Sequence, residues 1–417
     1  MKITFVLSTV ERVGGVRAVF EYADRLLKKG HRVSIVYPAV NLAYLKRASF
    51  GELVGWFLTS LTCYIKNATR EECPKPFKTA SRLTKIPFLY SRFIDVAEKK
   101  IPDADIVVAT TSETAYAVNA LSDSKGQKCY FVQSYEIWDL WNDTQCWKEA
   151  KKLRRGDEKC SLAMAAVVPK KKNFKESKAS VDRSYHLPLR KITIAEWLRR
   201  LIEDKFGERV DGVIPNGINL EIFFKEGNSR EESKQINVLI PYWPAELKGF
   251  KDGVDAFGRI RARHPNAHFA AYGRKPLANI SELRKLRKLP KWIEFHDIKS
   301  DAQLRALYNE THVFVSPSWI EGFALPPMEA MACGCAVVTT DASGFADYLT
   351  NGETALVVPI KDPNALAQSV CRLIEDAGER QRVAGNGYEL VKHFSWEDAT
   401  AKLEAILKNV NERASVP

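Results

Sequence analysis

The most evident chemistry in this sequence lies in two acidic residues on either side of a glycine-containing loop. Glu321 is followed at once by Gly322, and Glu329 comes after seven intervening residues. A strand is predicted at 313–316 and a helix at 327–332, so one carboxylate lies in a loop and the other in a helix. Free backbone N–H groups near the helix start can bind phosphate oxygens or sugar hydroxyls. By spacing alone, the plainer interpretation is favoured: a loop carboxylate and an exposed helix carboxylate, without a ligand.

Alternating strands and helices are predicted to position these acids. In the first half, a strand at 3–7 leads through a turn at Gly14-Gly15 into a helix at 17–29 and a strand at 31–37. Such a unit implies parallel pairing in a doubly wound sheet. Other strands are expected at 106–109, 128–132, 191–194, 237–240, 267–272, 293–296, 313–316 and 336–338. These sheets bind ligands at the carboxyl ends of their strands.

The chain has 417 residues, which is too long for one ordinary core. We expect an α/β protein with a Rossmann-like domain at 1–215, a second Rossmann-like domain at 216–392 and a final segment at 393–417 that contains a helix. Two domains that face each other across a cleft suit a nucleotide-linked ligand.

Composition and charge limit which cellular compartment and which binding partners we expect. The net charge of +12 favours an anionic partner, and eight cysteines without a Cys-x-x-Cys pair suggest a reduced, intracellular compartment. No secretory signal is expected. The apolar stretch 50–65 reaches roughly 24 Å as a helix, against about 30 Å for a bilayer core, so no transmembrane helix is expected there. A position at the membrane surface is left open.

Residues 316–338, which read SPSWIEGFALPPMEAMACGCAVV, resemble the signature of the retaining glycosyltransferases of family four, which have the GT-B fold. Other segments match in order: Gly14-Gly15, 214–218, Lys248-Gly249, 351–359 and 394–396. The resemblance covers nearly the whole chain and is strong after about residue 191. It implies that the domain at 1–215 binds the acceptor, that the domain at 216–392 binds the donor, and that the helix at 393–417 returns to the first domain.

Several site residues follow from that resemblance. It implies that Glu321 contacts the donor sugar near the transfer site, that Lys248 neutralises the diphosphate as it leaves, and that Glu329 binds the ribose hydroxyls. It also implies backbone contacts to the donor from Gly15, Ile298, Gly322, Phe323, Ala324 and Leu325. Gly15 would reach the diphosphate from the opposite domain, and Ile298 would line the base pocket.

Two positions depart from the family pattern. Tyr242 stands where relatives carry an arginine; Arg274, or Lys251 together with Lys248, is expected to supply the missing charge. Relatives also place a histidine after the middle strand of the first domain, and none follows 106–109 here.

The acceptor is therefore assigned to other residues of the first domain. Ser112 and Glu113 are candidates for the place of the histidine, with a solvated loop as the alternative. Tyr135 and Glu136 follow the next strand and would point at the cleft. Trp138, Trp141 and Trp147 could stack on sugar rings, although aromatic packing under a long loop is the favoured interpretation.

The sequence thus predicts a retaining glycosyltransferase that needs neither a metal nor another cofactor. It would move a hexosyl or deoxyhexosyl group from a nucleotide diphosphate sugar to a hydroxyl of a saccharide or lipid-linked saccharide, in cell-surface polysaccharide synthesis. We expect it in the cytoplasm, with an anionic membrane surface as a partner. Alternatives are a GT-B sugar phosphorylase or epimerase, a degenerate sugar-binding protein, and a nucleic-acid-binding protein, the last disfavoured because the lysines are dispersed.

Overall fold

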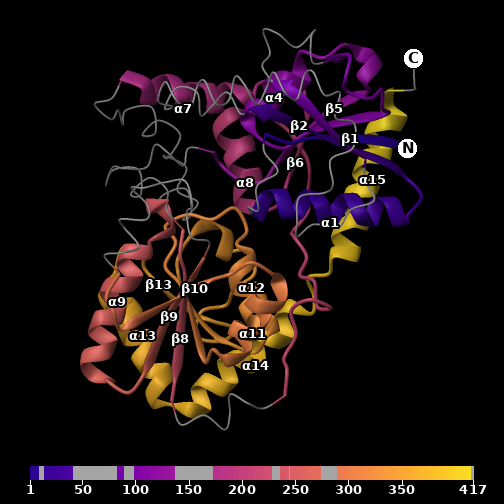
Figure 1. Cartoon of the computed structure of the whole chain (residues 1–417). Coiled ribbons are helices and arrows are strands. Elements are labelled where there is room, and N and C mark those ends of the chain that lie inside the picture. The colour runs from indigo at the N-terminus through magenta and orange to yellow at the C-terminus, as the bar shows by residue number, and fades with distance from the viewer. Residues whose placement is uncertain are drawn as a thin grey trace. The chain divides into compact units, whose positions relative to one another are not determined.

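The computed structural model describes residues 1–8, 14–40, 82–88, 98–136, 172–227, 235–243, 245–273 and 289–414. They form two compact units. The first unit comprises the described residues of Met1–Ile137, Val168–Asn216 and Trp396–Pro417, and the second unit those of Gly217–Ser395. Each unit contains one parallel sheet covered by helices (Figure 1).

The sheet of the first unit has seven parallel strands in the order β3-β2-β1-β4-β5-β6-β7. Its strands are β1 (Lys2–Val6), β2 (Arg32–Val40), β3 (Arg82–Phe88), β4 (Ile106–Ala109), β5 (Gln127–Val132), β6 (Arg190–Thr193) and β7 (Val210–Val213). The central strand β4 is buried along its whole length, as expected for a parallel strand with helices on both faces.

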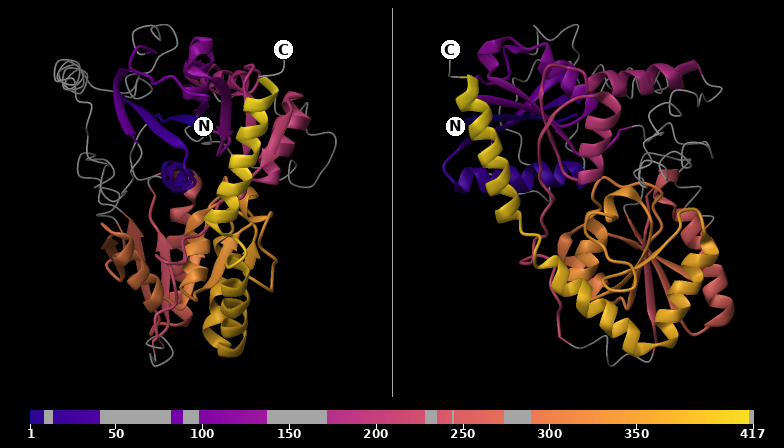
Figure 2. Two further views of the ribbon diagram at one scale, coloured as in Figure 1. Left: turned by 90° about the vertical axis from the view of Figure 1, so that its right-hand side faces the viewer. Right: turned by 180° about the vertical axis from the view of Figure 1, so that it is seen from behind.

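The helices of the first unit include one from the far end of the chain. They are α1 (Gly14–Lys28), α4 (Ser112–Asn119), α7 (Lys172–Ser184), α8 (Glu196–Arg200), which continues as a π-helix at Leu201–Lys205, and α15 (Trp396–Ala414). Helix α15 packs on α1 (Figure 2). Between them the rings of Trp396 and Tyr22 meet edge to face, with centroids 5.2 Å apart. Arg25 Nε donates to Glu397 Oε1 at 2.8 Å beside them.

The sheet of the second unit has six parallel strands in the order β10-β9-β8-β11-β12-β13. They are β8 (Asn237–Pro241), β9 (His268–Gly273), β10 (Ile293–Asp297), β11 (Val313–Ser316), β12 (Ala336–Thr340) and β13 (Leu356–Val358). Figure 1 shows α9 (Phe250–Arg263) and α13 (Pro363–Glu375) on one face, with α11 (Asp301–Glu310) and α12 (Leu325–Ala332) on the other. The order places β8 beside β11, so the loops that follow these two strands share one edge of the sheet.

The doubly wound α/β architecture predicted from the sequence is confirmed in both units, with local differences. Gly14 and Gly15 begin helix α1 rather than forming a turn. Strand β3 lies in a region where no strand was predicted, and it extends the first sheet beside β2. Helices α13 and α14 (Ala377–Val391) were not predicted, although Asp362 caps α13 and Pro363 occupies its first turn.

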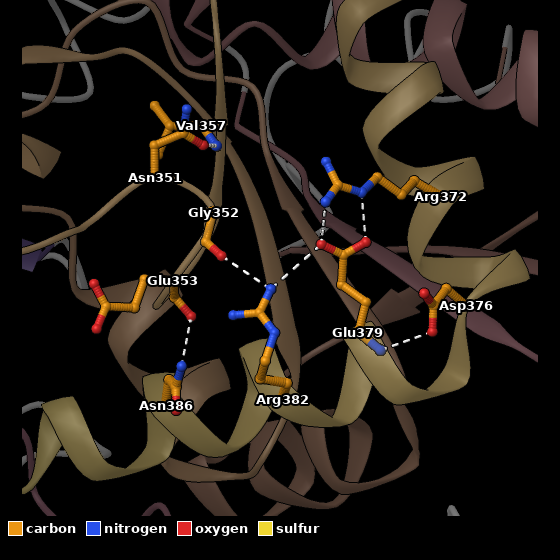
Figure 3. Close-up of polar contacts among 9 residues, drawn as sticks. All are labelled: Asn351, Gly352, Glu353, Val357, Arg372, Asp376, Glu379, Arg382 and Asn386. Carbon is orange, nitrogen blue, oxygen red and sulfur yellow. Dashed lines mark hydrogen bonds and ion pairs between the residues drawn. The ribbon is translucent and has the colours of Figure 1, made fainter.

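The turn that precedes β13 is held by helix α14 (Figure 3). Arg382 donates to the carbonyl of Gly352 at 3.0 Å, and Asn386 Nδ2 donates to the carbonyl of Glu353 at 3.1 Å. Asn351 Oδ1 accepts from the Val357 backbone N–H at 2.8 Å. The Asn-Gly-Glu segment of the family resemblance therefore has a structural task here: it attaches the last strand of the sheet to its covering helix.

The apolar segment 50–65 lies outside the described residues. Among the helices that the structure describes, none is long and apolar enough to cross a membrane.

Candidate functional site

An ion pair joins the loops that follow β8 and β11 in the second unit. Lys248 Nζ lies 2.8 Å from both Glu321 Oε1 and Glu321 Oε2. The side chains are 25% and 12% exposed, so the pair is largely withdrawn from water yet still reachable. Both residues were predicted from the sequence as site residues, and the structure brings them into direct contact at the edge where parallel sheets bind ligands.

Backbone contacts hold these two loops against each other. Lys248 ends a short 3-10 helix, Glu246–Lys248, and Gly249 follows with φ +61°. A Cβ on Gly249 would lie 1.9 Å from the Pro317 carbonyl oxygen, so only glycine permits this approach. On the other side of Lys248, the Trp319 backbone N–H donates to the Leu247 carbonyl at 2.8 Å.

The loop from Glu321 to α12 contains a strained residue. Ala324, the N-cap of α12, has φ +64°, which costs a non-glycine residue on the order of 1–3 kcal/mol. Its carbonyl accepts a bond of 3.1 Å from the buried Tyr348 hydroxyl. A Cβ on Gly344 would lie 2.7 Å from the Glu321 carbonyl oxygen, so the loop also lies directly on this glycine. The helix begins at Leu325, two residues earlier than predicted.

Glu329 is buried rather than exposed, with 4% of its surface accessible. Tyr308 donates to Glu329 Oε2 at 3.3 Å, and the hydroxyls of Tyr308 and Tyr272 lie 2.6 Å apart. Burial raises the pKa of Tyr308 well above its ordinary value, so its hydroxyl keeps the proton that it donates. The sequence did not point to either tyrosine; their positions near the end of β9 and within α11 become meaningful only after folding.

Tyr242, at the position of the family arginine, is buried among aromatic rings. Its ring meets those of Phe250 and Phe295 edge to face, with centroids 4.9 and 5.8 Å away. Of the two suggested replacements for the arginine, Arg274 lies outside the described residues, and Lys251 is exposed and paired with Asp255 at 2.7 Å. Ile298 follows β10, and its backbone N–H donates to the Gly273 carbonyl at 2.9 Å.

The first unit holds a second carboxyl group at the corresponding edge of its sheet, beyond β4 and β5. Glu136 Oε2 accepts bonds of 2.7 Å from both the backbone N–H and the hydroxyl of Ser112. Burial, as the main cause, raises the pKa of Glu136 to about 7; the two bonds from Ser112 oppose the rise and the charge of Glu113 adds to it. This carboxyl group therefore changes protonation near neutral pH.

Ser112 and Glu113 lie in the first turn of helix α4 rather than in a loop. Thr111 caps this helix in a reciprocal capping box with Thr114. Ser112 is buried and Glu113 is exposed. The structure thus joins two of the four acceptor candidates, Ser112 and Glu136, in one contact.

Tyr135, the remaining candidate, is buried with 2% of its surface accessible. Its hydroxyl donates to Asp182 Oδ1 at 2.6 Å and lies 3.0 Å from Lys205 Nζ. Tyr135 is thereby part of an internal polar cluster. Trp138, Trp141 and Trp147 lie outside the described residues. Gly15 lies in α1, where an added Cβ would come 3.2 Å from the Gln133 side chain.

Comparison with known proteins finds a family match within the second unit. Residues 239–376 match the family described as glycosyl transferases group 1. O-antigen chain mannosyltransferase B of Escherichia coli is 32% identical over 111 residues, which are 27% of this chain and 29% of that protein. The capsular polysaccharide biosynthesis glycosyltransferase CapM of Staphylococcus aureus is 29% identical over 204 residues, which are 46% of this chain and 54% of that protein. The chain thus spans about half or less of the length of these relatives.

Solved structures match over the whole chain. Sucrose-phosphate synthase from Thermosynechococcus elongatus has a TM-score of 0.71 at 16% identity and covers 98% of this chain and 99% of its own. HepE of Anabaena, in complex with UDP and glucose, has a TM-score of 0.66 at 14% identity and covers 98% of this chain and 100% of its own. At these identities the likeness concerns the fold. The chain has the GT-B fold, and its segment 239–376 matches the model of the glycosyl transferases group 1 family.

Proposed function

We propose that the chain is a glycosyltransferase that moves a sugar from a nucleotide diphosphate sugar to a hydroxyl of a saccharide or lipid-linked saccharide. The observation that carries this proposal is the contact of Lys248 Nζ with both Glu321 oxygens, inside the segment that matches the family. A cation and a carboxylate at one strand edge suit a ligand with a diphosphate next to sugar hydroxyls. The related proteins that act on O-antigen chains and capsular polysaccharide support an acceptor of that class.

In this proposal the second unit binds the donor. Lys248 stabilises the charge that develops on the leaving diphosphate, and Glu321 hydrogen-bonds the transferred sugar. Backbone groups of Gly322, Phe323, Ala324 and Leu325 bind the sugar and diphosphate at the start of α12, where the helix dipole favours an anion. Glu329 binds the ribose hydroxyls, with Tyr308 orienting the carboxylate. Ile298 lines the base pocket and Gly15 approaches the diphosphate.

The proposed transfer retains the anomeric configuration and uses no metal. The acceptor oxygen attacks the anomeric carbon on the face from which the diphosphate departs. A new C–O bond forms, the bond from carbon to the phosphate oxygen breaks, and the acceptor proton passes to the leaving phosphate. Lys248 and oriented backbone N–H groups supply the stabilisation of charge.

The acceptor is assigned to the first unit in this proposal. Glu136, held by Ser112 at 2.7 Å, provides a hydrogen-bonding carboxyl group in the place of the histidine that relatives use. Glu113, exposed on the first turn of α4, provides a second acid nearby.

A thermal-shift screen against UDP-, GDP-, ADP- and dTDP-sugars tests the donor assignment. We expect stabilisation by one nucleotide class and its loss in the Lys248→Ala variant. Incubation with the selected donor and lipid-linked acceptors then yields product whose anomeric configuration is read by NMR. An inverted product contradicts the retaining mechanism, and absence of stabilisation by every nucleotide contradicts the donor site.

The proposal places the chain in the cytoplasm at an anionic membrane surface. The support is the apolar segment 50–65 with its basic neighbours Lys46, Arg47, Lys66 and Arg70. Flotation with liposomes that contain anionic lipid tests it, and failure of the intact chain to float contradicts it.

A further inference from the structure

Trp319, two residues before Glu321, contacts the chain on both sides of Lys248. Its backbone N–H donates to the Leu247 carbonyl at 2.8 Å, immediately before the lysine. Its indole Nε1–H donates to Asp252 Oδ2 at 2.7 Å, four residues after the lysine and in the first turn of α9. Trp319, in the loop of Glu321, is therefore hydrogen-bonded to the chain both before and after Lys248.

A third side chain completes this arrangement from the end of β13. Lys361 Nζ lies 3.8 Å from the centroid of the Trp319 ring, within the range of a cation–π interaction. Burial raises the pKa of Asp252, and the hydrogen bond from Trp319 and the charges of Lys251 and Lys361 oppose that rise. We call Trp319, Asp252 and Lys361 the Trp319 brace.

Backbone strain marks the same place. Ala324 and Lys361 are the two non-glycine residues with positive φ in the part of the chain that the structure describes. Ala324 lies three residues after Glu321. Lys361 lies over the ring of Trp319, which is two residues before Glu321. Strained residues persist where surrounding contacts over-determine them, and they cluster where geometry serves function. Both strained residues here have an aromatic partner, Tyr348 for Ala324 and Trp319 for Lys361.

These observations indicate that residues without direct substrate contact help to arrange the site. We infer that Trp319 and Asp252 are positioning residues, whose hydrogen bond fixes the separation of the Lys248 and Glu321 loops and so prepares the ion pair for the transferred group. The inference rests on the proposed glycosyltransferase function. It predicts an effect on the rate of transfer rather than on the binding of nucleotide, because the brace holds reacting groups in register.

The test compares Trp319→Phe, which keeps an aromatic ring but loses the indole N–H, with Trp292→Phe. Trp292 is a matched control: it is half-buried, has Arg261 over its ring at 5.2 Å, and precedes β10 at the opposite, amino-terminal edge of the sheet. We expect Trp319→Phe to lower kcat about 10- to 100-fold with the dissociation constant for nucleoside diphosphate changed less than about threefold. Trp292→Phe should leave kcat unchanged. If both variants lose only thermal stability and keep kcat, the positioning role is wrong.

Asp252 gives a second, independent comparison. Asp252→Asn retains an oxygen that can accept the indole hydrogen bond, whereas Asp252→Ala does not. Rescue of kcat by asparagine relative to alanine supports the hydrogen bond as the active element. Equal losses in both variants overturn it.

A measurement without substrate separates this inference from the proposed function. Unfolding free energies of Trp319→Phe, Lys248→Met and the double variant form a cycle. If the change in unfolding free energy of the double variant differs from the sum of the two single changes, the brace is supported even when no sugar donor is turned over. If the changes are additive, the brace is overturned. Failure of the wild-type chain to bind any nucleoside diphosphate would instead count against the proposed function.

Discussion

The carboxyl edges of the two sheets each carry a partly buried glutamate, and their partners differ. Glu321, beyond β11, contacts a lysine from the loop after the neighbouring strand. Glu136, beyond β5, accepts two bonds from the serine that follows its neighbouring strand. The architecture is the same, but one acid has a cationic partner and the other a neutral one. In the first arrangement a lysine ammonium group contacts the carboxylate, while in the second burial raises the pKa of Glu136 to about 7.

The difference is consistent with the different tasks that we propose for the two acids. A charge pair suits a site that meets a diphosphate, because the lysine can stabilise developing negative charge without any change of protonation. A carboxyl group with a pKa near 7 can donate as well as accept a hydrogen bond within the physiological range. That property suits an uncharged hydroxyl-bearing ligand.

Removing the cation should have the largest effect. We expect Lys248→Ala to lower kcat/KM about 100- to 1,000-fold, the range found when a single stabiliser of developing charge is removed. Lys251→Ala is the matched control, because Lys251 is exposed and paired with Asp255 on its own helix. Steady-state kinetics with the selected donor measure both variants. Equal losses of kcat/KM in the two variants would mean that Lys248 does not stabilise the leaving diphosphate, and the proposed difference between the two sheet edges would be wrong.

Neutralising the other acid should change how stability depends on pH. Below pH 4.5 the Glu136 carboxyl is protonated in both the folded and the unfolded chain; between pH 4.5 and about 7 only the folded chain holds the proton. Rising pH therefore reduces stability through this window, by roughly 3 kcal/mol in total from this group. Glu136→Gln should abolish the loss. Urea unfolding at pH 5 and pH 8 measures the difference, and identical pH profiles for both proteins would refute the raised pKa.

Trimming the neutral partner should have the smallest effect of the three. Ser112→Ala removes the hydroxyl but keeps the backbone N–H, so one of two bonds that favour the ionised carboxylate is lost. We expect the pKa of Glu136 in the folded chain to rise further, which extends the upper end of the pH window over which stability falls. The midpoint of that window, from unfolding at closely spaced pH values, is the readout. A downward shift would show that the hydroxyl does not favour the charged form.

Much of this organisation could be predicted from the sequence, because parallel strands flanked by helices leave short apolar runs such as those at 106–109 and 313–316. The family resemblance also predicted Glu321 and Lys248 as site residues, but it did not predict their direct contact. Spacing did not reveal the burial of Glu329, since its partner Tyr308 lies 21 residues away and meets it only across packed helices. The hydrogen bond between Trp319 and Asp252 could not be predicted from spacing either, because the two residues are 67 positions apart in the sequence and meet only in the folded chain.

Strand β3 and helix α14 were not predicted, because polar residues weaken the sequence pattern of each element. Strand β3 reads Arg-Leu-Thr-Lys-Ile-Pro-Phe, in which basic residues and a proline weaken the strand pattern. Its pairing with β2 supplies what local propensity does not. Helix α14 contains three glycines and many charged residues, and its attachment to the turn before β13 through Arg382 and Asn386 compensates.

Helix α15 gives the molecule a particular order of assembly. Its buried residues Leu403 and Leu407 complete the first unit, and Glu404 reaches His31 Nε2 at 3.1 Å and Lys29 Nζ at 2.9 Å. During synthesis on the ribosome, however, this helix emerges only after every residue of β8 to β13. The first unit, although it is made first, is therefore the last to be completed. A nascent chain that stops at residue 216 should expose the face of α1 that α15 covers, and would be a natural substrate for chaperones.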